Sequence, residues 1–108
     1  MFTLKGKVAL ITGGARGLGY QIAETYAEAG ANVIVCSRDG EACEKAAVQL
    51  ANDYHVTTLG VRCDVTDEQE VEHVVRQVVE QFGTIDILVN NSGASWAAPI
   101  EQTPLQGW

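Results

Sequence analysis

The stretch VALITGGARGLG, which runs from Val8 to Gly19, decides the fold of this chain. It opens with a continuous apolar run, which is typical of a parallel strand buried on both faces. A Thr-Gly-Gly turn ends this run, and apolar residues then recur at helical spacing over residues 18–29. Free N–H groups at the start of a helix attract anions. The stretch therefore predicts a strand, a turn that binds phosphate, and a helix.

Strands and helices also alternate along the rest of the chain. Apolar runs predict further strands at residues 33–36, 56–61 and 85–89, of which the second is mixed in polarity and is expected nearer an edge. Helical spacing predicts helices at residues 41–51 and 66–82. Because crossovers between parallel strands are right-handed, this order predicts an α/β fold, a Rossmann-type doubly wound parallel sheet.

The spacing also predicts which helix faces are buried and how one helix is capped. In the first helix, the expected apolar face consists of Leu18, Ile22 and Tyr26, which recur every four residues, with Ala23 and Ala27 beside them. The third helix is expected to begin at Thr66, with Gln69 completing a capping box. The apolar stripe of the third helix is expected to contain Val71, Val74, Val75, Val78, Val79 and Phe82.

The composition is that of a globular protein and excludes several classes of partner. Of the 108 residues, 46% are hydrophobic and 19% are charged, and the formal net charge is −7. Such an acidic chain does not suit a nucleic acid, and no basic amphipathic helix offers a membrane surface. Cys36, Cys43 and Cys63 form no C-x-x-C pair, and His55 and His73 stand apart in the sequence. We therefore expect three buried thiols, no metal site and a cytoplasmic protein.

The last residues have the pattern of a helix that begins rather than of a domain that ends. Thr103, Pro104 and Gln106 are residue types preferred at the N-cap, first and third positions of a helix. A single turn is too short to be stable alone. We therefore expect the sheet to be truncated after the fourth strand. Residues 1–108 would then be the N-terminal dinucleotide-binding part of a single Rossmann domain that continues beyond the chain.

Each glycine of the phosphate-binding turn has an expected task. Gly13 permits a tight turn after the strand, Gly17 lets the backbone approach a pyrophosphate, and Gly19 lets the helix pack closely. Leu18 lies in the first turn of the helix, where free N–H groups suit the phosphate. The spacing Gly-x3-Gly-x-Gly differs from the Gly-x-Gly-x2-Gly of long-chain dehydrogenases. A Walker A loop is excluded because no Gly-Lys-Ser/Thr follows.

Three motifs, each at the predicted end of a strand, together resemble the signature of the classical short-chain dehydrogenase/reductase family. The resemblance covers the whole chain, and the one departure is Ser92, where the family pattern has alanine. The motifs are Thr12-Gly-x3-Gly-x-Gly19, Asp64-Val65 and Asn90-Asn91-Ser92-Gly93.

The resemblance implies roles for the second and third motifs. Asp64 would accept a hydrogen bond from the adenine amino group, and the amide of Val65 would donate to a ring nitrogen. Asn90 and Asn91 would divide two tasks, tying adjacent strands together and lining the ribose site, and the sequence does not separate them. Gly93 would let the chain pass close to the cofactor.

The end of the second strand indicates which nicotinamide cofactor is bound. NAD-specific folds place an acidic side chain there, and by register with the family that position is Ser37. Arg38 follows it, and Arg16 precedes the middle glycine. Two guanidinium groups suit the 2′-phosphate of NADP(H), which is therefore predicted. The alternative is that Arg38 merely pairs with Asp39, which could itself bind the ribose of NAD(H).

The resemblance further implies a homo-oligomeric enzyme that transfers hydride reversibly between the nicotinamide and a carbonyl or secondary-alcohol substrate. The family uses a serine and a Tyr-x3-Lys pair, but no tyrosine of this chain is followed by lysine at that spacing. We therefore assign no catalytic residue here and expect all three beyond Trp108. Residues 95–99 resemble gluconate 5-dehydrogenase-like and 3-oxoacyl-reductase-like members, unless they form an ordinary loop anchored by Trp96.

Two functions of other classes stay open at this point. The chain could belong to a non-catalytic NADP(H)-binding module that senses redox state, which a full-length sequence without Tyr-x3-Lys would favour. It could also belong to a Rossmann-like methyltransferase, which expects an acidic ribose contact after the second strand and does not predict residues 90–93.

Overall fold

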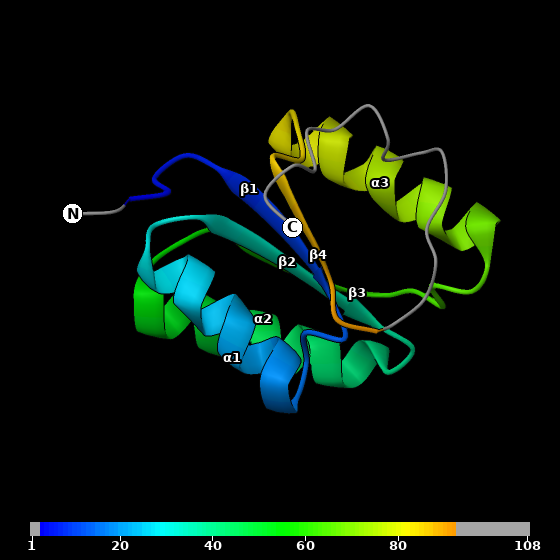
Figure 1. Ribbon diagram of the computed structural model, residues 1–108, viewed down its shortest axis with the longest axis horizontal. Helices are drawn as coiled ribbons and strands as arrows, with labels where there is room; N and C mark the ends of the chain where they lie inside the picture. The colour runs from blue at the N-terminus through cyan, green and yellow to red at the C-terminus, as the bar shows by residue number, and fades with distance from the viewer. Residues whose placement is uncertain (1–2, 93–108) are drawn as a thin grey trace.

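The computed structural model describes residues 3–92 and forms one parallel sheet with helices on both faces (Figure 1). The sheet has the strand order β3-β2-β1-β4, and every neighbouring pair is parallel. This arrangement confirms the predicted doubly wound α/β fold. The elements are β1 (Val8–Thr12), α1 (Gly17–Glu28), β2 (Asn32–Ser37), α2 (Gly40–Tyr54), β3 (Thr58–Arg62), α3 (Glu68–Phe82) and β4 (Ile87–Asn90).

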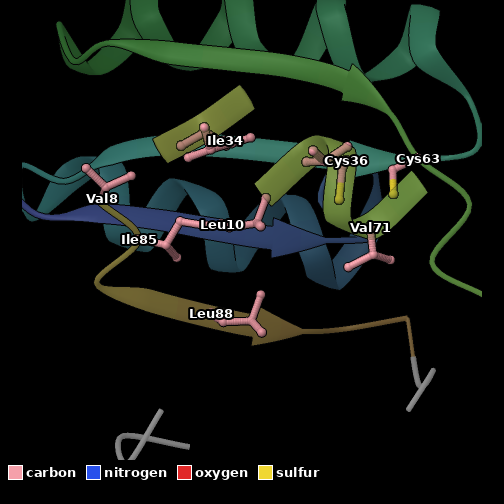
Figure 2. Close-up of a cluster of buried hydrophobic side chains, with 10 residues drawn as sticks. Val8, Leu10, Ile34, Cys36, Cys63, Val71, Ile85 and Leu88 are labelled. Carbon is pink, nitrogen blue, oxygen red and sulfur yellow. The ribbon is translucent and has the colours of Figure 1, made fainter. Parts of the chain in front are cut away.

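Alternate residues of the central strands supply two separate cores. Leu10 of β1 points toward α3, where it packs with Ile34, Cys36 and Leu88 (Figure 2). Ile11, the next residue, belongs to the opposite core beneath α1 and α2. Because both faces of β1 are covered, all five of its residues are buried, as its continuous apolar run predicts. The two cores hold the carboxyl ends of the strands in one rigid edge.

The predicted edge position of the third strand is confirmed, since β3 pairs only with β2 among the described strands. Gly60, which was not singled out in the sequence, lets α2 pack closely against this strand. A Cβ placed on Gly60 would overlap the backbone carbonyl of Cys43, so glycine lets the helix lie directly on β3. The second helix also extends beyond the predicted residue 51 to Tyr54, where His55 ends it in the left-handed conformation with φ 58°.

The predicted apolar face of the first helix is confirmed for Ala23 and Ala27 and was wrong for Leu18. Gly19, Ala23 and Ala27 are the buried residues of α1, whereas Leu18 is 65% exposed. Ile22 and Tyr26 flank the core and are partly buried. Small side chains let the helix axis approach the sheet, so the closest face of α1 carries the smallest residues rather than the largest.

The predicted start of the third helix was also wrong by one position. Asp67, not Thr66, caps α3, and its carboxylate accepts hydrogen bonds from the N–H groups of Gln69 and Glu70. Gln69 therefore receives the cap through its backbone instead of completing a capping box. Val79, which was assigned to the apolar stripe, is 43% exposed. The helix predicted to begin at Thr103, and residues 95–99, lie outside the described residues.

Candidate nucleotide-binding site

A cleft of about 410 Å³ lies at the carboxyl ends of the strands. Parallel α/β sheets bind ligands at this edge. Five of the residues that line it were predicted from the sequence as cofactor ligands, and Cys63, Thr66 and Ser92 were not. The five are Gly13, Ser37, Arg38, Asp64 and Val65.

The glycine-rich turn has the conformation that the spacing requires. Gly13 and Gly17 have φ values of +63° and +55°, a region that side chains other than glycine rarely adopt. A Cβ on Gly17 would meet no atom within 4 Å, so this glycine faces open space. At Gly19 a Cβ would overlap the carbonyl oxygen of Gly13 and lie 2.8 Å from Nδ2 of Asn91. Gly19 thus allows close packing as predicted, although the nearest contact is the loop backbone and not the sheet.

The N-terminus of α1 differs from those of the other two described helices. Asp39 caps α2 and Asp67 caps α3 through their carboxylates, whereas Arg16 at the N-cap of α1 makes no capping hydrogen bond. The first turn of α1 also holds no acidic residue. The backbone N–H groups at the positive end of this helix therefore receive no capping carboxylate, although Asp39 lies nearby in its ion pair with Arg16. Together with the open space at Gly17, this end fits a phosphate group.

Two arginines lie near the end of β2, and they are held in different ways. Arg38 lines the cleft directly, and its charge helps to lower the pKa of the Asp64 carboxyl. Arg16 reaches across from α1 and pairs with Asp39, with 2.6 Å between Nη2 and Oδ2. The alternative in which Arg38 pairs with Asp39 is therefore not what the structure shows. Ser37 donates its hydroxyl toward the carbonyl of Asp39 and also lies 3.1 Å from the sulfur of Cys43.

Asp64 is held rigidly at the end of β3. Its Oδ1 accepts hydrogen bonds from the hydroxyl of Thr66 at 2.6 Å and from the Thr66 N–H at 3.0 Å. These bonds, chiefly the one from the hydroxyl, lower the pKa of the Asp64 carboxyl. The backbone N–H of Asp64 donates to Glu70 of α3 at 2.9 Å, and Glu70 also pairs with Arg62. Glu70 was not singled out in the sequence, because it lies on the helix rather than in a motif.

The structure distinguishes the roles of Asn90 and Asn91, which the sequence alone did not. Asn90 extends β4 beside Thr12 of β1, and its Oδ1 accepts from the Thr12 hydroxyl at 3.1 Å. Asn91 instead contacts the glycine-rich turn, because its Nδ2 lies 3.4 Å from the carbonyl oxygen of Gly13. Asn90 therefore ties two strands together, while Asn91 links the fourth strand to the turn. Gly93, the last residue of that motif, lies outside the described residues.

Thr12 connects these segments and was not predicted as a site residue. It is fully buried, and its hydroxyl oxygen accepts from the N–H groups of Asn91 at 2.9 Å and Ser92 at 3.2 Å. A single hydroxyl thus fixes the exit of β4 against β1. The sequence contained a weak signal for this role, since Thr12 is the one polar residue at the end of an apolar strand.

We expect Thr12→Val to destabilise the protein by about 1–3 kcal/mol, because two partly buried N–H groups and the Asn90 side chain lose their hydrogen-bond partner while the side-chain volume is kept. Urea denaturation followed by circular dichroism measures this change. Thr58→Val is the matched control, since the Thr58 hydroxyl makes one hydrogen bond, to the carbonyl of Ala47 at 2.7 Å. Equal losses of stability in the two variants would contradict the bridging role of Thr12.

Other kinds of site find no support in residues 3–92. No group of three or more His, Cys, Asp or Glu side chains there could hold a metal ion. None of the helices in this part of the chain has the length and apolar character needed to cross a bilayer. The three cysteines are free and buried, as the sequence predicts.

Comparison with known proteins agrees with the motifs. The family model described as short chain dehydrogenase matches residues 7–108. The rhamnolipids biosynthesis 3-oxoacyl-[acyl-carrier-protein] reductase of Pseudomonas aeruginosa is 40% identical over 107 residues, which cover 99% of this chain and 41% of that protein. The chain thus spans about two fifths of the length of this curated relative.

Solved structures share the fold. The Pseudomonas aeruginosa RhlG/NADP active-site complex superposes with a TM-score of 0.78 and 39% identity over 92% of this chain and 38% of that chain. An NAD⁺-bound xylitol dehydrogenase superposes with a TM-score of 0.74 and 37% identity, covering 78% of this chain and 32% of that one. Both nicotinamide cofactors therefore occur among similar structures.

Proposed function

This chain belongs to the short-chain dehydrogenase family, and on that premise we propose that it provides the cofactor site of an NADP(H)-dependent oxidoreductase. The full protein would transfer hydride reversibly between the nicotinamide and a carbonyl or secondary alcohol. When bound, the cofactor supplies the hydride, and the residues of this chain hold and orient it. Family membership does not support the methyltransferase alternative.

The observation that carries the proposal is the uncapped N-terminus of α1 beside open space at Gly17. An aspartate neutralises the equivalent position of α2 and of α3. We assign the pyrophosphate of the cofactor to this end of α1, where a phosphate would take the place of a capping carboxylate. The residues assigned to it are Gly13, Gly17, Leu18 and Gly19, while Arg16 is assigned to the 2′-phosphate of the adenosine half.

The adenosine half of NADP(H) is assigned to the 410 Å³ cleft. Asp64, fixed by Thr66, and the backbone of Val65 would bind the adenine ring. Ser37 and Arg38 would face the 2′-phosphate, because the end of β2 offers a hydroxyl and a guanidinium and its Ser37 is uncharged. Asn91 would lie nearest the ribose, together with Gly93, while Asn90 holds the strands beneath it.

The chemistry itself is assigned to the remainder of the protein. Tyr20, Tyr26 and Tyr54 are followed four residues later by Glu24, Gly30 and Thr58, so none forms a Tyr-x3-Lys pair. We propose that the proton-transferring serine, tyrosine and lysine lie outside residues 1–108, in a protein that acts as a homo-oligomer. Ketose–polyol pairs and 3-oxoacyl compounds are the substrate classes to assay first, given the relatives. Three free, buried thiols support a reducing, cytoplasmic location.

Cofactor choice provides the test of the proposed function. We expect Arg38→Asp to reverse the preference for NADP(H) over NAD(H), weakening NADP(H) binding about tenfold or more, because a cation that suits a phosphate dianion becomes an anion that repels it. Calorimetric titration with each cofactor measures both dissociation constants. Arg76→Asp, the same charge change on the exposed face of α3, is the control. Equal affinities for the two cofactors in the wild type would refute the assignment to NADP(H).

A further inference from the structure

We propose that Asp39 is a built-in competitor for the 2′-phosphate of NADP(H): its carboxylate holds the Arg16 guanidinium, and the phosphate must displace it. Asp39 would therefore set how strongly the protein prefers NADP(H) over NAD(H). This inference rests on the proposed function, since it concerns the same adenosine site.

The ion pair between Arg16 and Asp39 lies where two helices begin. Arg16 stands at the N-cap of α1 and Asp39 at the N-cap of α2, so their contact joins the starts of two helices. Asp39 directly follows Ser37 and Arg38, the residues that line the adenosine cleft at the end of β2. Arg16 and Asp39 both line a second hollow at the starts of α1 and α2, where the Arg16 guanidinium is held by an anion that belongs to the chain itself.

Asp39 is held more firmly than Arg16, its partner in the ion pair. Oδ1 of Asp39 accepts a hydrogen bond from the N–H of Ala42 at 3.0 Å, and the Asp39 N–H donates to the Ser37 hydroxyl at 3.2 Å. Arg16 contacts Asp39 through Nη2 alone, and the Arg16 side chain is 72% exposed. The carboxylate is therefore fixed by the backbone of α2, while the guanidinium can turn toward another anion.

The 2′-phosphate can replace the Asp39 carboxylate as the partner of Arg16. A guanidinium binds a phosphate in the same way as a carboxylate, through parallel charge-assisted hydrogen bonds, and the phosphate carries more charge. An exposed ion pair is worth little in water, so the exchange is readily reversible. Once Arg16 has turned, the Asp39 carboxylate is left near the phosphate dianion and repels it. The 2′-hydroxyl of NAD(H) is neutral, so its binding requires no such exchange.

The test is Asp39→Asn, which removes the charge but keeps a side-chain oxygen that can cap α2. Adenosine 2′,5′-bisphosphate and 5′-AMP are the probes, because they share every group except the 2′-phosphate. In the full-length protein we expect the variant to bind the bisphosphate about two- to fivefold more tightly, while its affinity for 5′-AMP is unchanged. Calorimetric titration measures both constants.

Asp67→Asn is the matched control, because Asp67 caps α3 in the same way and is not in contact with Arg16. It is expected to leave both affinities unchanged. If Asp39→Asn impairs folding, Asp39→Ser replaces it, since serine is an equally good N-cap with a shorter, uncharged side chain. Bisphosphate affinity that stays the same or falls in these variants, with a wild type that prefers the bisphosphate, overturns the competitor role alone. A wild type that binds both probes equally overturns the NADP(H) assignment as well.

Discussion

Gly17→Ala is expected to weaken NADP(H) binding by about 100-fold or more while the protein remains folded. A methyl group at this position would project into the open space assigned to the pyrophosphate. The backbone N–H groups around it could then no longer reach the phosphate oxygens. Each hydrogen bond to a charged group contributes about 1.5–3 kcal/mol, so the loss of two corresponds to about 100-fold in affinity.

The control for Gly17→Ala must share its backbone strain. Gly17 has φ +55°, so any side chain there also costs about 1–2 kcal/mol of conformational energy. Gly83 at the end of α3 has φ +90° and equally open surroundings, but it caps the C-terminus of its helix, where no free N–H groups face a phosphate. Gly83→Ala should therefore lower the thermal midpoint by a similar amount and leave cofactor affinity intact. Equal cofactor affinities for the two variants in calorimetric titration would place the pyrophosphate elsewhere.

The parts of the fold that the sequence predicted are those governed by local pattern. A continuous apolar run followed by a glycine-rich turn specifies a buried strand and the start of a helix whatever else the chain does. The errors came from spacing and residue type, which do not show how closely a helix approaches the sheet. Leu18 was placed on the apolar face by its four-residue spacing from Ile22, yet close packing of α1 buries Gly19, Ala23 and Ala27 instead. At the start of α3, Thr66 and Asp67 are both good caps, and only the geometry shows that Thr66 binds Asp64 instead.

The parts of the site that could not be predicted depend on contacts between distant residues. Thr12 and Asn91 are separated by 79 positions, and the one polar residue at the end of an apolar strand does not indicate which distant segment it binds. Arg16 and Asp39 are separated by 23 positions, and the sequence suggested Arg38 as the partner of Asp39 because it is adjacent. An adjacent side chain on an extended segment points away from its neighbour, whereas α1 brings Arg16 across the gap between two helix starts.

Gly19→Ala is expected to act in the opposite way to Gly17→Ala, destabilising the fold itself by about 3 kcal/mol or more. The two glycines are separated by a single residue, but the added methyl group meets different surroundings. At Gly19 it would overlap the carbonyl oxygen of Gly13 and lie 2.7 Å from the Gly13 carbonyl carbon. Backbone atoms cannot rotate away as a side chain can, so either the turn or the whole of α1 must shift away from β1.

Urea denaturation followed by circular dichroism measures this loss, with Gly40→Ala as the control. Gly40 is also in the first turn of its helix, but a methyl group there would lie 3.1 Å from the Cβ atom of Arg62, which requires a shift of only a few tenths of an ångström. We expect the control to change stability by less than about 1 kcal/mol, since alanine is also the better helix former. A Gly19→Ala variant as stable as this control would mean that the turn tolerates displacement. We would then have to abandon the idea of a rigid turn. The distinction between Gly19, which packs, and Gly17, which faces the cofactor, would also fail.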